Sequence, residues 1–349
     1  MKILVLASDL GKIGGTQNYT KAFIEEARRT GASVSVCELF SISLLGKLFF
    51  AVRYFASVVF HRPHVVFCTH VGFSPLCLVT KTILGISYSV SVYGIEVEHP
   101  LSFQKKGLAS ASRIVYLFQN TKEIVERNVP ETKDKFILLP NSIDIGKYQL
   151  GAKDATLEKK LHTKGKKVIY TLCRLSASER DNKGYEKVLR ALPVVVSEVP
   201  DARYVLAGGG DDIEYVRSVI DELRMQEYVE LPGRIPDEEM VEFYRLADAF
   251  VFPSKREGFP AIVLLEALAC GKPVIGGNQP GSDEFEGFLG LIVNPDDGRA
   301  LAEAIIKILE KDIPPDVCNP EKLRARVDER YGLKAYAKRV EDYINIFRK

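Results

Sequence analysis

The sequence predicts an α/β protein built from two doubly wound parallel sheets, one in each half of the chain. Short β-branched runs alternate with longer amphipathic segments along all 349 residues. Strand–helix–strand alternation is typical of parallel sheets wrapped by helices. At about 150 residues per domain, the length itself predicts two domains. We therefore expect two such domains facing across a cleft, which loops at the carboxyl ends of the strands would line.

Each half holds a series of strands separated by helices. In the first half the strands are predicted at 2–8, 33–38, 64–69, 87–93, 113–117 and 136–139. In the second half they are predicted at 168–173, 203–208, 228–231, 249–252, 273–276 and 290–293. Segments with helical length and period lie between most of them, for example at 16–30, 185–199, 237–247 and 299–311.

The two predicted domains cover residues 1–150 and 166–330. Residues 146–166 are polar, lysine-rich and without a strand pattern, so they are expected to join the domains. Residues 331–349 are expected to form a C-terminal helix that packs back on the first domain.

The composition indicates a soluble, cytoplasmic protein. Lysine and arginine total 48 against 46 acidic residues, a formal net charge of +2 that gives no signal for nucleic acid. The six cysteines form no C-x-x-C pair, which argues against a zinc site or a disulfide framework. The apolar run at the N-terminus is too short for a signal peptide, and we expect no membrane-spanning helix.

The segment after the strand 249–252 is the first candidate site. The predicted helix 261–270 is apolar on every face except at Glu266 and is therefore expected to be buried. A buried carboxylate needs a partner, which is either a ribose diol or a neighbouring arginine. Free amides at the helix start suit a diphosphate. Glu257, in the preceding loop, either binds sugar hydroxyls or is a solvated loop charge.

Two further segments carry phosphate chemistry. Arg174 and Lys183 flank a polar loop after the strand 168–173, and two fixed cations can neutralise a diphosphate as it leaves; an exposed charged loop is the alternative. The glycine run 208–210 would let a ligand approach the backbone. The loop 9–16 is neither a G-x-G-x-x-G fingerprint nor a P-loop. The sequence contains no D-x-D, H-E-x-x-H or G-x-S-x-G motif, which disfavours a metal-held diphosphate and serine-hydrolase chemistry.

Taken together, these motifs resemble glycosyltransferase family 4, whose members have the GT-B fold. The resemblance is carried in the second half by Arg174…Lys183-Gly184, Gly208-Gly209-Gly210-Asp211, Gly233-Arg234-Ile235, Pro253-Ser254…Glu257-Gly258-Phe259 and Leu265-Glu266-Ala267…Cys270-Gly271-Lys272-Pro273. Weaker landmarks in the first half are Gly14-Gly15, Tyr93-Gly94-Ile95-Glu96 and Pro140-Asn141-Ser142-Ile143-Asp144.

The resemblance implies a retaining, metal-independent and cofactor-free transfer of a sugar from a nucleotide-diphospho-sugar. It makes the first domain the acceptor-binding one and the second the donor-binding one. Arg174 and Lys183 would hold the diphosphate, Glu266 the ribose, and Glu257 the donor sugar as a catalytic residue. The remaining donor-binding candidates are Gly15, Gly209, Arg234, Ile235, Ser254, Gly258, Phe259, Pro260 and Ala261.

Two departures from the family pattern concern the catalytic candidates. Eight residues separate Glu257 from Glu266, where the family has seven. Tyr93 stands where many members carry a histidine beside the reacting sugar. A tyrosine can donate a hydrogen bond there but does not readily accept a proton, so Tyr93 is a catalytic candidate of unsettled role, with Glu96 a weaker one.

Charge is unevenly distributed, and this bears on partners. Residues 1–164 hold 21 Lys/Arg and 13 Asp/Glu, whereas residues 165–349 hold 27 and 33. The basic half contains the aromatic segment 44–62, which is either an ordinary core helix or an interfacial helix on anionic lipid. We expect a glycan or lipid-linked acceptor in cell-surface polysaccharide synthesis, no nucleic acid, and a cytoplasmic enzyme that is peripheral on the membrane. A nucleotide-sugar 2-epimerase and a non-catalytic nucleotide-sugar-binding subunit are the alternatives.

Overall fold

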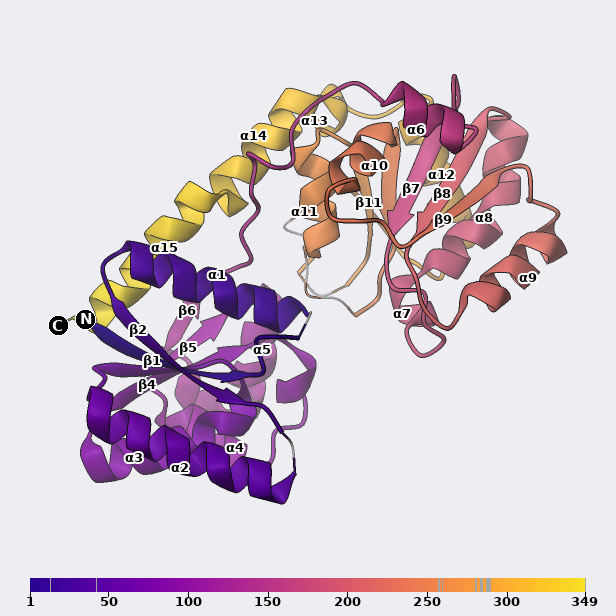
Figure 1. The fold of residues 1–349 in the computed structure, drawn as a ribbon. Coiled ribbons are helices and arrows are strands. Elements are labelled where there is room, and N and C mark those ends of the chain that lie inside the picture. The colour runs from indigo at the N-terminus through magenta and orange to yellow at the C-terminus, as the bar shows by residue number, and fades with distance from the viewer. Residues whose placement is uncertain are drawn as a thin grey trace. The chain divides into compact units, whose positions relative to one another are not determined.

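The structure is a computed structural model that describes residues 1–12, 14–41, 43–256, 258, 260–279, 281–282, 285–286 and 290–348. The chain divides into two compact units (Figure 1). Unit 1 comprises residues 1–142 and 334–349, and unit 2 comprises residues 143–333.

Unit 1 is built on a six-stranded sheet of order β2-β1-β3-β4-β5-β6, in which every pairing is parallel. Its strands are β1 Lys2–Ser8, β2 Ser33–Leu39, β3 Val65–Cys68, β4 Ser87–Val92, β5 Arg113–Tyr116 and β6 Phe136–Leu138. Its helices are α1 Gly15–Arg29, α2 Leu44–His61, α3 Ser74–Leu84, α4 Ser102–Ser110, α5 Gln119–Asn128 and the C-terminal α15 Leu333–Ile346.

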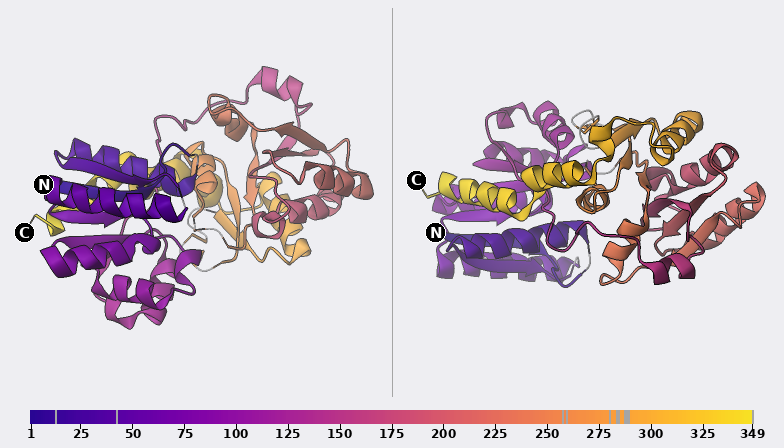
Figure 2. Two further views of the ribbon diagram at one scale, coloured as in Figure 1. Left: turned by 60° about the horizontal axis from the view of Figure 1, so that its bottom comes forward. Right: turned by 90° about the horizontal axis from the view of Figure 1, so that it is seen from above.

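Helices cover both faces of this sheet (Figures 1 and 2). α2, α3, α4 and α5 contribute to one buried cluster, with Phe50, Tyr54 and Leu108 among its members. α1 and α15 contribute to the cluster on the opposite face, which includes Phe23 and Tyr343. The last helix of the chain is thus part of the core of the first unit.

Unit 2 repeats the architecture with a parallel six-stranded sheet of order β12-β11-β10-β7-β8-β9. Its strands are β7 Lys167–Leu172, β8 Ala202–Ala207, β9 Val229–Gly233, β10 Ala249–Phe252, β11 Val274–Gly277 and β12 Gly290–Val293. Its helices are α6 Ala155–Lys160, α7 Arg180–Lys183, α8 Tyr185–Glu198, α9 Ile213–Leu223, α10 Met240–Leu246, α11 Ile262–Ala269, α12 Gly298–Leu309, α13 Pro315–Cys318 and α14 Pro320–Tyr331. The predicted strands are confirmed to within one or two residues at each end.

The predicted linker is the clearest difference from the sequence-based expectation. Residues 143–166 belong to unit 2 rather than between the units. Tyr148, Leu157 and Leu161 are buried in its core, and α6 lies within this stretch. Lysines surround these widely spaced apolar residues, so the sequence shows no periodicity there.

The expectation about membrane-spanning length also needs correction. α2 has 18 residues and is long and apolar enough, by length and composition alone, to cross a membrane. Only 17% of it is buried inside the protein. Phe50, Tyr54 and Val58 form its buried stripe, so α2 is a core helix on one side and exposed on the other.

Candidate functional site

The strand order of unit 2 defines where a ligand would bind. From β7 the chain adds β8 and β9 on one side, and then returns to add β10, β11 and β12 on the other. The switch point of this order therefore lies between β7 and β10. Ligands of open parallel sheets bind outside the carboxyl ends of the strands at such a point. The loops that follow β7 and β10 are those that carry Arg174 and the segment 253–261.

The glycine-rich turn after β8 is packed against the loop after β7. Leu175 donates its backbone N–H to the carbonyl of Gly209 at 3.1 Å, and Asp212 donates to the carbonyl of Leu175 at 3.1 Å. Gly208 has a φ of +138°, and a Cβ added there would lie 1.7 Å from the Cys173 carbonyl oxygen. Only glycine fits at this position. Gly209 itself is exposed, so its backbone is open to a ligand.

Arg174 and Lys183 are presented differently by the structure. Arg174 is exposed and forms no hydrogen bond or ion pair with any residue in the part of the chain that the structure describes. Lys183 is largely buried; its Nζ lies 5.8 Å from the centre of the Phe252 ring, at the end of β10, and 3.7 Å from Glu179. One cation is thus unengaged, and the other is held at the switch point.

Arg180, a third cation of this segment, is engaged elsewhere. Its Nε donates to the Asp212 carboxylate at 2.7 Å, and its guanidinium carbon lies 3.4 Å from the centre of the Tyr215 ring. The hydrogen bond to Asp212 raises the pKa of Arg180. Arg180 therefore serves to fix the β7–α8 region and is not available to a phosphate.

Glu266 lies in the second turn of α11, where the sequence predicted a buried carboxylate. Burial raises its pKa above the ordinary value of 4.5. Within the part of the chain that the structure describes, no arginine pairs with Glu266, unlike the arginine partner that we considered. Instead, the hydroxyl of Tyr148 donates to Oε1 at 2.6 Å and that of Tyr244 donates to Oε2 at 2.5 Å. Each carboxylate oxygen keeps acceptor capacity, because an ionised carboxylate offers about four lone-pair sites.

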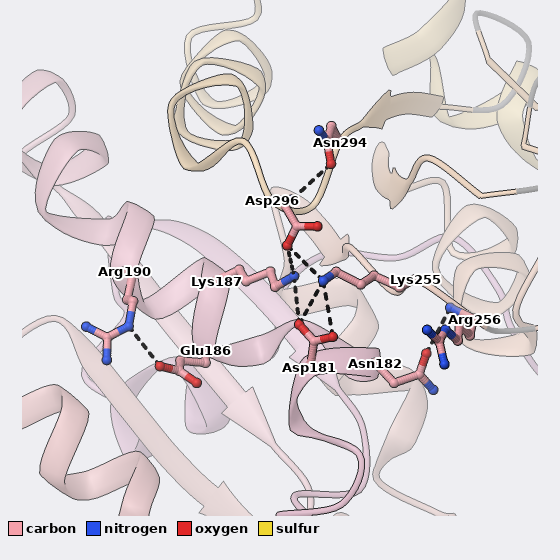
Figure 3. A network of polar contacts seen from close by, with 9 residues as sticks. All are labelled: Asp181, Asn182, Glu186, Lys187, Arg190, Lys255, Arg256, Asn294 and Asp296. Atoms are coloured by element: carbon pink, nitrogen blue, oxygen red, sulfur yellow. Dashed lines mark hydrogen bonds and ion pairs between the residues drawn. The ribbon is translucent and has the colours of Figure 1, made fainter.

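A network of four alternating charges ties the loop after β10 to two other segments (Figure 3). The Lys255 Nζ lies 2.8 Å from Oδ1 of both Asp181 and Asp296. Lys187 pairs with the same two carboxylates, at 3.1 and 2.6 Å. These ion pairs hold the pKa of each aspartate below its usual value and that of Lys255 above it. We call Asp181, Lys187, Lys255 and Asp296 the loop clamp.

Backbone contacts strengthen this attachment. The Lys255 N–H donates to the carbonyl of Asn182 at 3.0 Å, and the Arg256 N–H donates to Oδ1 of Asn182 at 2.8 Å. The loop after β10 is thereby fastened to α7 just before the position of Glu257. Glu257 and Phe259 lie outside the described residues.

The other candidates of unit 2 have mixed environments. Ser254 is fully buried and accepts a hydrogen bond from Nε2 of Gln279 at 3.1 Å, so it is a supporting residue. Arg234 is exposed at the end of β9, next to the buried Ile235. Gly258 and Pro260 are partly exposed, and the buried Ala261 caps the start of α11.

In unit 1, Gly15 lies at the start of the helix that follows β1, and Tyr93 comes directly after β4. Gly15 begins α1, it is exposed, and a Cβ there would meet nothing within 4 Å. The Tyr93 hydroxyl is buried and has no hydrogen-bond partner among the described residues, and burial raises its pKa. The hydroxyl therefore points into unit 1 and not toward solvent, and the catalytic role considered for Tyr93 stays a prediction.

Glu96 instead organises the backbone at this point. Its carboxylate accepts from the N–H of Tyr93 at 2.5 Å and from that of Gly94 at 3.1 Å. Both carboxylate oxygens are therefore used to hold the turn after β4.

Sequence reasoning missed the tyrosine partners of Glu266 and the loop clamp. Tyr148 lies in the presumed linker, and Tyr244 lies on a helix that carried no motif. The clamp joins residues 115 positions apart, and nothing in the sequence pairs them.

Comparison with known proteins identifies the family. The family of glycosyl transferases group 1 matches residues 152–330, about half of the chain. The chain belongs to this family, which confirms the resemblance on which the prediction of a glycosyltransferase rested.

Curated relatives and solved structures agree with this assignment. Over 135 residues the chain is 33% identical to a GDP-mannose-dependent alpha-(1-6)-phosphatidylinositol monomannoside mannosyltransferase of Mycolicibacterium smegmatis, a match that covers 36% of this chain and 35% of the relative. Over 185 residues it is 30% identical to the monoacylated-substrate mannosyltransferase of Corynebacterium glutamicum, covering 50% and 47%. The matches thus span between a third and half of these relatives.

Two solved structures share the fold over the whole chain. Anabaena HepE in complex with UDP has a TM-score of 0.82 at 18% identity, covering 99% of this chain and 100% of HepE. Sucrose-phosphate synthase of Thermosynechococcus elongatus has a TM-score of 0.80 at 18% identity and covers 100% of both chains. The predicted GT-B fold is confirmed.

Proposed function

We propose that this protein transfers a hexose, with retention and without a metal ion, from a nucleotide-diphospho-sugar to a glycan or lipid-linked acceptor in cell-surface polysaccharide synthesis. The observation that carries the proposal is the grouping in unit 2 of an unpaired arginine, a glycine-rich turn and a buried carboxylate around one switch point. The named mannosyltransferase relatives and the neighbours solved with UDP support a nucleotide sugar as the donor.

Each part of this grouping suits one part of such a donor. Arg174 offers the diphosphate an exposed cation that has no ion-pair partner among the described residues. Amides at the start of α11 add a partial positive charge. The Gly208–Gly210 backbone allows close approach, and Glu266 has the acceptor capacity that a ribose diol requires.

The same groups support the chemistry. As the bond from the anomeric carbon to the diphosphate oxygen breaks, negative charge builds up on the leaving group. We propose that Arg174, Lys183 and the α11 amides stabilise that charge, which would lower the barrier. Because protein cations supply this stabilisation, we propose that a chelator leaves the transfer rate unchanged.

The proposal is less specific about the acceptor than about the donor. The relatives named above act on phosphatidylinositol mannosides. By analogy we propose a lipid-linked or glycan acceptor, met by a cytoplasmic enzyme at the membrane surface.

A thermal-shift screen against GDP-mannose, UDP-glucose and UDP-GlcNAc tests donor binding, because a ligand that binds only the folded state raises the melting temperature. We expect one nucleotide class to stabilise the protein and Glu266→Gln to abolish that shift. The matched control is Glu303→Gln, a change to an exposed glutamate of α12, which should keep it. If no nucleotide sugar shifts the melting temperature, the proposal fails.

Product analysis with the donor so identified separates the alternatives. Sugar appearing on an added acceptor supports the transferase. Conversion of the donor without an acceptor would show an epimerase, and tight binding with neither transfer nor hydrolysis would show a binding subunit.

A further inference from the structure

We propose that the outer face of α2, α3 and α4 in unit 1 is a docking surface for an anionic lipid bilayer. We call this face the apolar face. The inference deepens the proposed function by naming where the enzyme meets a membrane. The inference rests on the proposed function only for the reason why the enzyme would meet a membrane. Bilayer binding itself can be measured without any donor.

Exposed apolar side chains are concentrated on this face. Among the described residues, 13 of the 17 exposed large hydrophobic side chains lie between Phe40 and Phe103. Such side chains scattered singly are normal, whereas a gathering of them marks an interaction site. On α2 they are Leu44, Leu45, Leu48, Phe49, Val52, Val59 and Phe60.

Helix α2 is held against the sheet by the buried side chains along its inner side. Phe50, Tyr54 and Val58 recur at every fourth position and are buried against the sheet. Phe49 and Phe60 remain 64% and 82% exposed. A helix anchored on one side cannot span a bilayer without leaving its core. It can lie in the interface with its outer side chains among the lipids.

The neighbouring helices extend the apolar face. Val79, Ile83 and Leu84 of α3 are exposed, as are Leu101 and Phe103 at the start of α4. α3 and α4 pack on the same buried cluster as α2, and Figure 1 shows all three on the side of the sheet away from α1.

The basic residues on this face indicate that the bilayer it would bind is anionic. Residues 39–95 contain no aspartate or glutamate but contain Lys47, Arg53 and Arg62, as well as Lys81, whose ammonium donates to the Ser110 carbonyl at 2.6 Å. Lys105 and Lys106 add two exposed cations on α4. The guanidinium of Arg53 lies 5.6 and 5.8 Å from the ring centres of Phe40 and Phe49, which joins charge to aromatic surface. Each basic residue near an anionic membrane surface strengthens binding to it.

The same charge pattern argues against a second copy as the occupant. A twofold interface would bring identical patches together. The cations of one copy would then face those of the other, with no acidic residue between 39 and 95 to pair with them.

The chain has no tryptophan, so the fluorescence of a single introduced tryptophan reports on its surroundings alone. Phe49→Trp should show blue-shifted emission with vesicles of phosphatidylglycerol and phosphatidylcholine, but not with pure phosphatidylcholine at low salt. Added salt should reverse the shift. Val194→Trp, at a half-exposed position on α8 in unit 2, is the matched control and should not respond to either vesicle.

Co-sedimentation of the full chain gives the second measurement. Phe49→Ser should lower the partition onto anionic vesicles about tenfold, the effect of removing one large apolar side chain that the bilayer would bury. Val194→Ser should leave it unchanged. Because both side chains are exposed, neither variant should alter the melting temperature, and thermal unfolding verifies this.

Three outcomes would overturn the proposal. Equal binding of neutral and anionic vesicles is one, and equal partition of the Phe49→Ser and wild-type proteins is another. The third is a wild-type dimer in analytical ultracentrifugation that Phe49→Ser converts to a monomer, which would assign the apolar face to a second copy.

Discussion

At the scale of single residues, Glu266 combines a proposed donor-binding role with an energetic penalty. Its carboxylate is held by two tyrosine hydroxyls, yet burial outweighs these bonds and raises its pKa. The folded protein therefore binds a proton at Glu266 more tightly than the unfolded chain does. Stability linked to this group is fully present below the ordinary pKa of 4.5 and is lost as the pH rises toward the folded-state value.

Glu266→Gln removes this titration and keeps the side-chain shape. We expect the melting temperature of the variant to gain on that of the wild type as the pH rises from below 4.5 toward neutrality. Calorimetry of both proteins across this range measures the change in their difference. A difference that stays constant with pH would show that Glu266 titrates normally in the folded protein.

The sequence located Glu266 but not its surroundings. An apolar helix with one carboxylate is visible as a pattern, because the burial of a helix follows from its composition. Its partners Tyr148 and Tyr244 lie 118 and 22 positions before Glu266 in the chain. Contacts at such separations depend on tertiary packing, which no local pattern encodes. Tyr93 shows the same limit. The family pattern indicated this position, but it did not indicate that the hydroxyl is buried inside unit 1.

At the scale of elements, the strands were predictable and the irregular segments were not. Buried strands such as β3 and β10 are continuous apolar runs, as expected where helices cover both faces of a sheet. The stretch 143–166 lacks such a run, and its burial comes from isolated residues such as Leu157 and Leu161. The same holds for the loop clamp, whose four charges look like ordinary surface residues in the sequence.

The loop clamp leads to a prediction about positioning. Its side chains are partly exposed, so solvent screens its ion pairs and they contribute little to stability. Lys255→Met should therefore shift the melting temperature little. Because Lys255 fastens the loop that leads to Glu257 and Gly258, we expect the KM for the nucleotide sugar to rise severalfold, and steady-state kinetics measures this.

The matched control for this change is Arg190→Met. Arg190 also forms two ion pairs in unit 2, with Glu186 at 2.8 Å and Glu222 at 3.1 Å. It lies on α8, and it forms no hydrogen bond or ion pair with the described residues of the loop (Figure 3). We expect its KM to match that of the wild type. Equal KM values for the two variants would remove the clamp from donor binding.

At the scale of the whole molecule, the order of segments along the chain differs from their grouping into the two units. Residues 334–349 complete unit 1, although all of unit 2 separates them from residue 142. Tyr343 of α15 is fully buried, and its hydroxyl lies 2.6 Å from Oγ of Ser89 on β4. Its ring makes edge contacts with Phe23 and Phe67, with centroids 5.5 and 5.6 Å apart. The first unit therefore depends on the last helix of the chain.

Tyr343→Ala should consequently destabilise unit 1 and spare unit 2. Replacing a buried aromatic residue by alanine costs about 3–5 kcal/mol, and that loss falls on the core shared by α1, α15 and the first sheet. In calorimetry we expect one unfolding transition to shift to lower temperature, while the transition that a nucleotide sugar stabilises stays in place. Lys338→Ala, on the exposed face of the same helix, is the matched control and should change neither transition. If Tyr343→Ala instead lowered both transitions together, the two units would unfold as one cooperative structure, and the division of the chain at residues 142 and 334 would have no thermodynamic counterpart.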